Sequence, residues 1–262
     1  MYRKIGILLS LAATALASAG VFAQEMGEGA LEEVIVTAEY RPVSVLELPT
    51  SISVFDQQAI ERRGAVHLEQ LLNLAPNVNL SSGASRGRFV LIRGIGERSQ
   101  FVEPINPSVG LIIDGMDFTG IGGAASTLDI QQVEILRGPQ GTLFGANALA
   151  GLINMVSNGP GDQVNGRADL TVGNYDRLTA SAALGAPLSD NAGFRLAVQS
   201  NKHDGYIDNI YLNRPTNDIS EFTARGKLNW KVSDELALGF TLFYSDVDNG
   251  YDAFSLDNTR ET

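Results

Sequence analysis

Few residues of this chain have the types and spacing that covalent catalysis requires. The run Gly83–Gly87 fits the pattern G-x-S-x-G, in which Ser85 would be a nucleophile at a sharp turn between a strand and a helix. No helix pattern follows it, because Phe89–Ile92 is a continuous apolar run typical of a strand. A catalytic base is also scarce, since the only two histidines are His67 and His203. We therefore predict that the protein is not an enzyme.

Motifs for cofactors and metals are equally weak. Gly120–Ala125 fits G-x-G-x-x-A, but no amphipathic helix follows it, as a dinucleotide-binding unit requires. Two histidines and no cysteine leave no transition-metal cluster, and we predict no cofactor. Acidic loop residues can hold Ca²⁺, but here they lack an EF-hand spacing, so we favour solvated loop acids. These residues are Asp204, Asp208, Asp246, Asp248 and Asp252.

The composition and the first residues indicate an exported protein. The formal net charge of −11 argues against nucleic acid as a partner, because such proteins present a basic surface. Arg3 and Lys4 precede an apolar run, Ile5–Leu16, that is too short to span a bilayer of about 30 Å. Small residues end it, so we predict a signal peptide over residues 1–23, with cleavage before Gln24.

A short β-prone segment follows a polar, glycine-rich stretch, Gln24–Ala30. Val34–Thr37 lies between an acidic pair and the break at Arg41-Pro42. A strand after a flexible tether can add to the edge of another protein's sheet. It can equally be an edge strand of the domain that follows. On these residues alone we favour the edge strand.

The next hundred residues predict a compact domain of strands and short helices. We expect a strand within residues 48–55 and a helix capped by Asp56, running through Arg63 and ended by Gly64. A second helix, Val66–Leu74, presents one apolar face built from Leu68, Leu71, Leu72 and Ala75. His67 lies off that face, so we predict that it is solvated.

Further strands of this domain alternate with glycine-rich loops. Arg88–Arg93 and Val109–Asp114 are two predicted strands, separated by the polar loop Glu97–Ser108. The loop Met116–Ala125 follows. The stretch Val133–Ser157 then reads as a strand, tight glycine turns and a second strand, because apolar runs flank its glycines.

Beyond a linker at residues 158–162, the pattern changes to long period-2 alternation. Five segments alternate apolar and polar side chains, most of them over roughly 9–11 residues, which is the pattern of membrane β-barrels. They cover about residues 164–172, 178–186, 194–198, 222–232 and 236–244. Short turns alternate with long loops, as in barrels with a periplasmic and an outer side. Five strands cannot close a barrel, so we expect the chain to stop inside an outer loop.

The order of these motifs resembles the N-terminal part of a TonB-dependent outer-membrane receptor. Val90–Gly94 is similar to the family's I-R-G strand, and Val109–Gly115 to its V-x-x-x-I-D-G strand. Val133–Pro139 with Gly141–Gly145, then Gly151–Asn154, is similar to its most diagnostic run. The resemblance covers about residues 31–160 by motif. Ala146 and Ala150 depart from it, where a basic residue and a glycine are usual.

The resemblance implies an α+β plug domain followed by antiparallel transmembrane β-barrel strands, five of roughly 22. The implied domains are a tether with a TonB box over residues 24–47, a plug over 48–160 and the start of the barrel over 161–262. The TonB box would comprise Glu33, Val34, Ile35, Val36, Thr37 and Ala38. The plug motif would comprise Arg93, Gly94, Asp114, Gly115, Glu134, Arg137, Gly138, Pro139, Gly141, Gly145, Gly151 and Asn154. Candidate substrate-facing residues are Glu97, Arg98, Gln100, Phe101, Asp117 and Phe118.

The resemblance also implies a mechanism and a location. The receptor would lie as a monomeric barrel in the lipid of the Gram-negative outer membrane. It would import a small molecule such as a ferric siderophore, cobalamin or a carbohydrate, with the ferric siderophore the commonest case. Pairing of the TonB box with TonB would couple import to the proton gradient through ExbB and ExbD. We expect Arg93, Glu134 and Arg137 to fix the plug by ion pairs. The alternative is a non-transporting or truncated surface protein, such as a passive pore or an adhesin.

Overall fold

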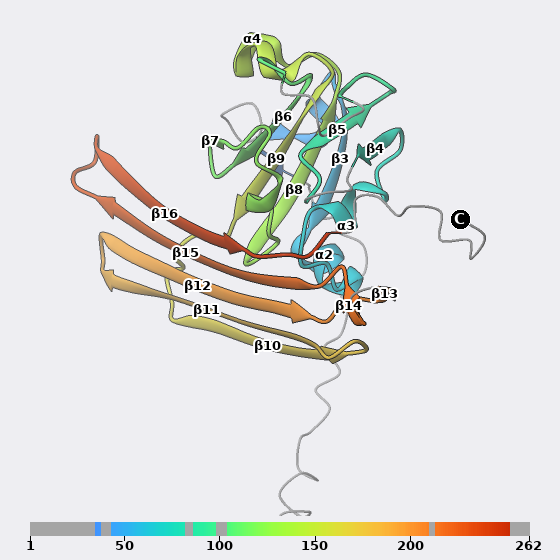
Figure 1. Cartoon of the computed structure of the whole chain (residues 1–262). Coiled ribbons are helices and arrows are strands. Elements are labelled where there is room, and N and C mark those ends of the chain that lie inside the picture. Colours follow the sequence, from blue (N-terminus) through green and yellow to red (C-terminus); the bar gives the residue numbers. More distant parts are fainter. Residues whose placement is uncertain (1–34, 38–42, 82–85, 98–103, 210–212, 252–262) are drawn as a thin grey trace, which may run out of the picture. The chain divides into compact units, whose positions relative to one another are not determined.

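The computed structural model describes residues 35–37, 43–81, 86–97, 104–209 and 213–251. These residues form two five-stranded sheets, three two-stranded sheets and several short helices. One large sheet belongs to the plug, and we name it the plug sheet. The other contains the long strands of the C-terminal half, and we name it the wall sheet (Figure 1).

The plug sheet has the strand order β3-β8-β9-β6-β7. Its strands are β3 (Ser51–Asp56), β6 (Val109–Ile113), β7 (Met116–Asp117), β8 (Ile130–Arg137) and β9 (Gly151–Ser157). The β6–β9 pair is parallel, and the other pairs are antiparallel. The predicted strands of Val133–Ser157 are therefore direct neighbours. Their apolar side chains are buried on both faces of the sheet, with Val133, Ile135, Leu136, Leu152 and Met155 fully enclosed.

Short helices connect the plug strands. The first, α2 (Gln57–Arg63), confirms the predicted cap, because the Asp56 carboxylate accepts from the Ala59 amide at 2.6 Å and Gly64 ends the helix at φ 61°. Turns of 3-10 helix form η1 (Val45–Glu47), η2 (Gly122–Ala124) and η3 (Gly145–Ala148). The last of these, together with α4 (Gly141–Phe144), fills the glycine-rich connection between β8 and β9.

The second predicted helix is shorter than expected. The structure gives only α3 (Glu69–Leu72), although the apolar face of Leu68, Leu71, Leu72 and Ala75 is buried as predicted. Residues 66–68 bond elsewhere: the Leu68 amide donates to the Ala125 carbonyl, and the Val66 carbonyl accepts from the Thr127 amide. Because these groups pair with the loop at residues 125–127, they cannot complete a helical turn.

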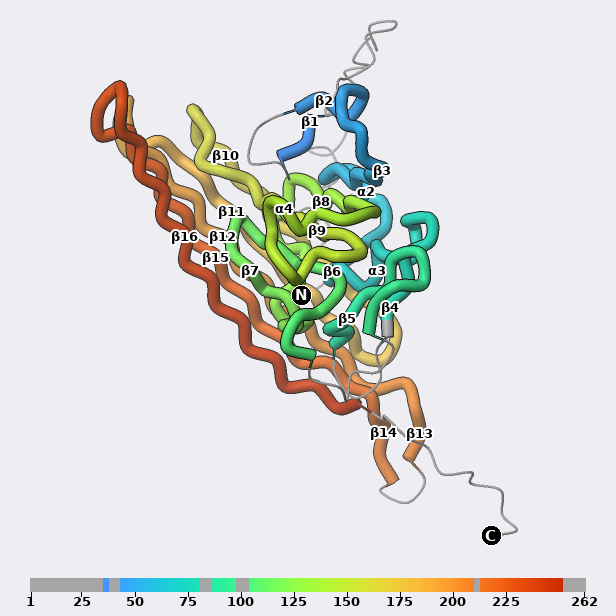
Figure 2. Tube along the Cα trace, turned by 90° about the horizontal axis from the view of Figure 1, so that it is seen from above, coloured from blue at the N-terminus to red at the C-terminus, as the bar shows by residue number. Residues whose placement is uncertain are grey.

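Two small sheets flank the plug sheet, and a third lies within the wall connections. They pair β1 (Ile35–Val36) with β2 (Val43–Ser44), β4 (Val78–Ser81) with β5 (Phe89–Ile92), and β13 (Ile207–Asn209) with β14 (Arg214–Thr216). The β13–β14 hairpin occupies the long connection after β12 and projects from one end of the wall strands (Figure 2).

The wall sheet is antiparallel throughout, with the order β10-β11-β12-β15-β16. Its strands are β10 (Asn165–Gly173), β11 (Arg177–Ser189), β12 (Ala192–His203), β15 (Ile219–Lys231) and β16 (Ala237–Val247). They confirm the five predicted strands and extend most of them. The turn between β10 and β11 is tight because Tyr175 and Asp176 both adopt positive φ, as primed hairpin turns require.

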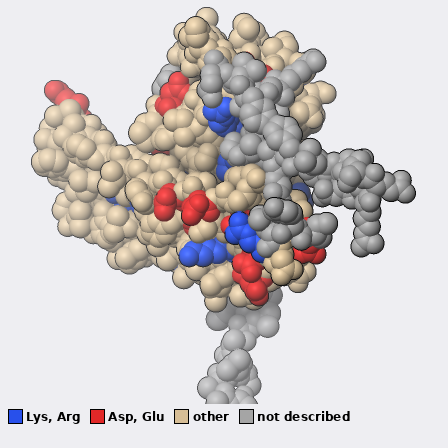
Figure 3. Space-filling model, viewed as in Figure 1, with Lys and Arg blue, Asp and Glu red and all other residues tan. Residues whose placement is uncertain are grey.

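The alternation of the wall strands separates two faces. Large apolar side chains on one face are exposed: Leu170, Val172, Leu178, Leu184, Leu196, Val198, Phe222, Trp230, Phe240, Leu242 and Tyr244. On the other face Thr179, Arg195, Asn201, Thr223 and Arg225 are buried. Figure 3 shows that much of the wall surface on the side in view carries no charged groups. The wall sheet is thus apolar on its outer face and polar on its inner face, as lipid on one side and the plug on the other would require.

Within the residues described, none of the helices combines the length and the apolar character needed to cross a membrane.

Candidate functional site

The inner face of the wall sheet meets the plug through ion pairs and polar hydrogen bonds. The wall contributes Arg195, Glu221, Arg225 and Lys227, and the plug contributes Glu69, Arg86, Asp114 and Asp129. We name these eight residues the plug–wall network. All four wall residues lie on the polar side of the predicted alternation, so the sequence predicted that their side chains point to the inner face. The sequence did not predict which plug residues they contact, because the plug residue bonded to each of Glu221, Arg195 and Lys227 lies more than 60 residues away in the sequence.

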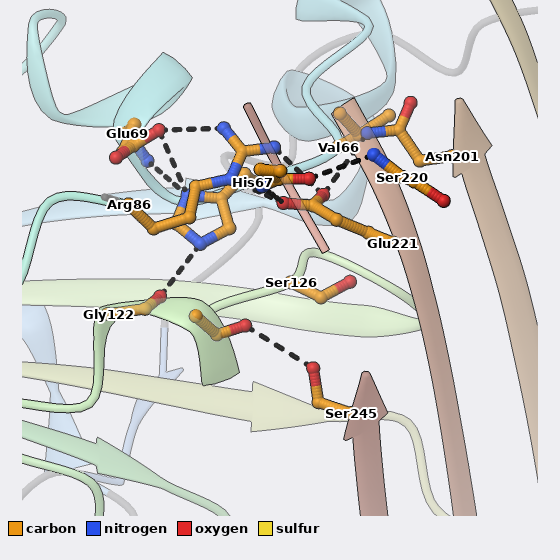
Figure 4. Close-up of polar contacts among 12 residues, drawn as sticks. Val66, His67, Glu69, Arg86, Gly122, Ser126, Asn201, Ser220, Glu221 and Ser245 are labelled. Carbon is orange, nitrogen blue, oxygen red and sulfur yellow. Dashed lines mark hydrogen bonds and ion pairs between the residues drawn. The ribbon is translucent and has the colours of Figure 1, made fainter. Parts of the chain in front are cut away.

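Arg86 links the plug to β15 (Figure 4). Its Nε and Nη2 donate to the two carboxylate oxygens of Glu221 at 2.6 and 2.8 Å, and its Nη1 donates to Glu69 Oε2 at 2.8 Å. Burial opposes the charge of Arg86, but the Glu221 and Glu69 carboxylates outweigh it and hold the pKa of Arg86 above its ordinary value. Asn201 and Asn249 also donate to Glu221. The bidentate Arg86–Glu221 pair fixes the relative orientation of the two side chains as well as the distance between them.

His67 is not solvated, and that prediction is wrong. Its side chain is buried, with a relative exposure of 2%. One ring nitrogen, Nε2, lies 2.9 Å from the Gly122 carbonyl oxygen, and the other accepts from the Glu69 amide at 3.3 Å (Figure 4). Burial, and then the nearby Arg86 guanidinium, lower the pKa of His67, so the neutral ring is favoured. Periodicity missed His67 because a bridge to Ser126, rather than a helix, sets its direction.

Asp114 is the acid of the predicted I-D-G motif, and it connects the end of β6 to β15. It accepts from Lys227 Nζ at 2.8 Å and from the Ser157 hydroxyl at 2.8 Å, and Arg225 Nε lies 3.6 Å away. Burial opposes ionisation of Asp114, but Lys227 and Arg225 hold its pKa below the ordinary range. Gly115 follows at φ 80°, which allows the tight turn into β7.

Asp129 makes a second acidic contact with the wall, just before β8. Its Oδ1 accepts from Arg195 Nη2 at 2.6 Å and from Asn158 Nδ2 at 3.0 Å. Arg195 also donates to Asn165 at the start of β10. The linker between plug and wall is therefore tied to the same acid that holds β12. Further along, Arg167 of β10 contacts Glu61 of α2.

Between these contacts the plug and the wall leave a cavity. It has a volume of about 410 Å³ and lies between α2 and the inner faces of β10, β11 and β12. Its lining mixes apolar residues with polar ones, among them Asp129, Arg167, Thr179 and Gln199.

The described part of the predicted TonB box lies against the plug. Ile35 and Val36 form β1, which pairs with β2, and Val36 is 1% exposed. The Thr37 amide and hydroxyl donate to Glu134 Oε1 at 2.8 and 3.2 Å. The remaining predicted members, Glu33, Val34 and Ala38, lie outside the described residues. Residues 35 and 36 thus pair with β2 as a short edge strand, and pairing of this segment with TonB stays a prediction.

The other predicted motif residues shape turns and close contacts. Arg93 (φ 55°) and Gly94 (φ 79°) form the turn after β5, and the Arg93 side chain is exposed. Gly138 and Gly145 have positive φ on either side of Pro139 and Gly141. Gly151 permits close approach, because a Cβ there would meet the Leu136 carbonyl oxygen. Asn154 donates to Glu134 Oε2 at 3.0 Å.

The expected ion pairs of the plug motif take a different form. Arg137 donates to the Pro76 and Ile52 carbonyl oxygens at 3.2 and 3.3 Å, so it ties plug segments together through their backbone. Among the residues that the structure describes, the plug–wall ion pairs use the network residues defined above and the Arg167–Glu61 pair.

Three of the six candidate substrate-facing residues, Glu97, Asp117 and Phe118, lie within the described residues. Glu97 accepts from the Ser108 amide and hydroxyl, both at 2.9 Å, and closes its own loop. Asp117 accepts from the Thr119 amide. Phe118 stacks edge-on against Phe243 of β16, with ring centroids 5.6 Å apart. Arg98, Gln100 and Phe101 lie outside the described residues.

The weak chemical motifs gain no support from the geometry. Gly120–Ala125 contains a 3-10 turn, η2, where a dinucleotide-binding motif needs a helix. Of the G-x-S-x-G run, only Arg86 and Gly87 are described; Arg86 belongs to the network, and the Gly87 amide donates to Glu69. Within the described ranges, no cluster of three or more acidic or histidine side chains is arranged to hold a metal ion.

Comparisons with known proteins agree with this architecture. Residues 44–152 match the family model of the TonB-dependent Receptor Plug Domain. The ferrioxamine B receptor of Salmonella typhimurium is 24% identical over 231 residues, covering 83% of this chain and 31% of that receptor. The pesticin receptor of Yersinia pestis is 30% identical over 141 residues, covering 53% of this chain and 20% of that receptor.

Solved structures show the same fold. The pyoverdine outer membrane receptor FpvA from Pseudomonas aeruginosa superposes with a TM-score of 0.68 at 19% identity, over 81% of this chain and 30% of that one. The ferric yersiniabactin uptake receptor FyuA from Yersinia pestis gives 0.67 at 24% identity, over 75% of this chain and 31% of that one. This chain spans about a third of the length of the ferrioxamine B receptor. The match over residues 44–152 assigns this part of the chain to the plug domain of TonB-dependent receptors, which are outer-membrane proteins of Gram-negative bacteria, and the described residues after it form five long antiparallel strands like those of the receptor barrels.

Proposed function

We propose that the complete receptor imports a scarce nutrient across the outer membrane by a TonB-dependent mechanism, with a ferric siderophore as the substrate. The observation that carries the proposal is the docking of residues 35–37 on the plug. This segment has a β-strand backbone, yet its ladder contains only the pairs Ile35–Ser44 and Val36–Val43. So short a ladder is marginal by itself, so the segment can leave the plug and pair with a strand of TonB.

The plug–wall network supports the same proposal. Its contacts are ion pairs and hydrogen bonds, several of them charge-assisted. Contacts of this kind can be exchanged for water one by one, whereas an apolar interface would expose its whole surface at once. The plug is thus held firmly but can shift within the barrel. The siderophore assignment rests on the relatives, since the names of several of them refer to ferrioxamine B, enterobactin or yersiniabactin.

The test is Ile35→Pro in the complete receptor, with radiolabelled ferric ferrioxamine B as the probe. Proline removes the backbone donor and disfavours strand pairing. We expect energy-dependent uptake to be lost while binding to intact cells persists. The matched control is Ile35→Ala, which keeps the amide and should retain uptake.

Two results would overturn the proposal. Uptake that survives Ile35→Pro would mean that strand pairing through this segment does not drive transport. Uptake by the unaltered receptor that persists after the proton gradient is collapsed would favour a passive pore.

A further inference from the structure

Glu134 is an unusual residue for its position in the fold. It lies in β8, between β3 and β9 in the plug sheet, and its relative exposure is 0%. Its neighbours along the strand, Val133 and Ile135, are core residues. A buried carboxylate is costly unless hydrogen-bond donors surround it.

The hydrogen-bond donors that the described residues are seen to direct at Glu134 include two groups. Gln132 Nε2 at 2.5 Å and Asn154 Nδ2 at 3.0 Å belong to the plug sheet. The Thr37 amide at 2.8 Å and its hydroxyl at 3.2 Å belong to the N-terminal segment. Gln132 Nε2 also donates to the Ile35 carbonyl at 3.1 Å. Two side chains of one strand face, Gln132 and Glu134, therefore hold the segment at both of its ends.

This division of donors has a direct consequence for release of the segment. When residues 35–37 leave, Glu134 loses the Thr37 donors but keeps those from Gln132 and Asn154. A carboxylate accepting from a backbone amide makes one of the stronger hydrogen bonds in a protein. The two-residue ladder to β2 is weak by comparison. Glu134 should therefore dominate the balance between the docked and the released segment.

We propose that Glu134 is the docking residue for the N-terminal segment and sets the fraction of receptors whose segment is free to bind TonB. The link to TonB rests on the proposed function, whereas the role of Glu134 in holding the segment concerns contacts within this chain alone. Weakening the Glu134 contact should raise the released fraction even when TonB is absent.

The experiment uses the complete receptor in outer-membrane vesicles. The sequence given contains no cysteine, so Val36→Cys, at a position that is 1% exposed while the segment is docked, offers a single label site in this part of the receptor. The measurement is the rate of maleimide alkylation at that site, without TonB. We expect Glu134→Gln to raise the rate about fivefold to tenfold, as for loss of one charge-assisted hydrogen bond. Thr37→Val, which removes only the hydroxyl donor, should raise it by about twofold to threefold.

The matched control is Asp56→Asn. Asp56 is also a plug carboxylate bonded to a backbone amide, and it lies opposite Gln132 in the β3–β8 register. Its substitution removes the same charge without touching the segment, and asparagine retains the helix cap. The alkylation rate should therefore stay at its starting value. Resistance of the plug to trypsin reports whether each variant is folded.

The outcomes separate this inference from the proposed function. Equal rates in Glu134→Gln, Thr37→Val and Asp56→Asn would overturn it, and Thr37→Val alone decides if Glu134→Gln does not fold. Affinity for the purified periplasmic domain of TonB is then measured. A higher alkylation rate without tighter TonB binding would leave the docking role intact and refute TonB pairing instead.

Discussion

The plug sheet and the wall sheet contain the same number of strands but distribute their side chains in opposite ways. In the plug sheet, the central strands bury apolar residues such as Ile135 and Leu152 on both faces. In the wall sheet, large apolar residues such as Leu242 are exposed and polar ones such as Arg225 are buried. The difference shows that each sheet is matched to its surroundings: other plug residues for the first, lipid and a polar plug surface for the second.

The comparison also explains how the two sheets meet. Apart from the contact of Phe243 with Phe118 and the plug core, the described contacts between the two are largely polar, and the plug–wall network consists of charged side chains. A contact of that kind gives precise placement and modest net free energy, because each charge was solvated before it paired. We therefore expect the plug and the barrel to draw most of their stability from contacts within themselves and little from contacts with each other.

The largest expected effect comes from reversing the polarity of the outer face. Leu242, in the middle of β16, is 76% exposed. Leu242→Arg should destabilise the complete barrel in a bilayer by about 2–4 kcal/mol, because the guanidinium would lie in lipid. Urea unfolding in lipid vesicles measures the change. Thr241→Arg, on the inner face of the same strand, is the matched control and should cost far less. A change within about 0.5 kcal/mol for Leu242→Arg would show that this face meets water.

A smaller effect is expected from breaking the plug–wall network at its centre. Arg86→Met keeps the length of the side chain but leaves Glu69 and Glu221 without their shared cation. We expect the plug to lose about 1–3 kcal/mol of stability, as for removal of one member of a partly buried charged pair. Protease digestion of the plug in the intact receptor measures it. Arg62→Met, at an exposed arginine of α2 outside the network, is the control; an equal loss there would contradict the role given to Arg86.

The smallest effect is a pH dependence that originates in His67. Its pKa is lowered in the folded plug, so the unfolded chain binds a proton more readily, and the protein loses stability as the pH is lowered. The stabilisation is present above the ordinary value of about 6.5 and is lost as the pH falls from there towards the folded pKa. Thermal unfolding between pH 7.5 and 5 should show this loss in the natural receptor and a shallower one in His67→Gln. Identical slopes in the two proteins would exclude His67 as the source.

Local patterns in the sequence predicted much of this structure. The cap at Asp56, the stop at Gly64 and the two faces of the wall strands follow from rules that operate within one turn or one strand. The long barrel strands followed from the same patterns, whereas the plug domain followed from the resemblance of the motifs to a known family. The α3 boundary and His67 were missed because contacts with residues 122–127 override helix propensity there.

The candidate site was predicted less completely than the fold. Asp114 and Glu134 were chosen through the motifs, but their partners Lys227 and Thr37 lie far away in sequence. Arg86 and Glu69 carry no local signal, because each is an ordinary charged residue until the chain brings Glu221 beside it. Pairings between distant segments depend on topology, which a period of two or of 3.6 residues does not encode.

The direction of the β1–β2 ladder determines how the N-terminal segment responds to mechanical force. Ile35 is paired with Ser44, and Val36 with Val43, so the chain enters β1 and leaves β2 at the same end. A load applied N-terminal to Ile35, with the plug held, pulls the two strands apart from that end. The residue pairs of the ladder then break one after the other, so they do not bear the force together. This is unzipping geometry, in contrast to shear, in which one strand slides along the other and all pairs break at once. A small force therefore opens the β1–β2 ladder, while the contacts of Glu134 and Gln132 with the segment have to be broken separately.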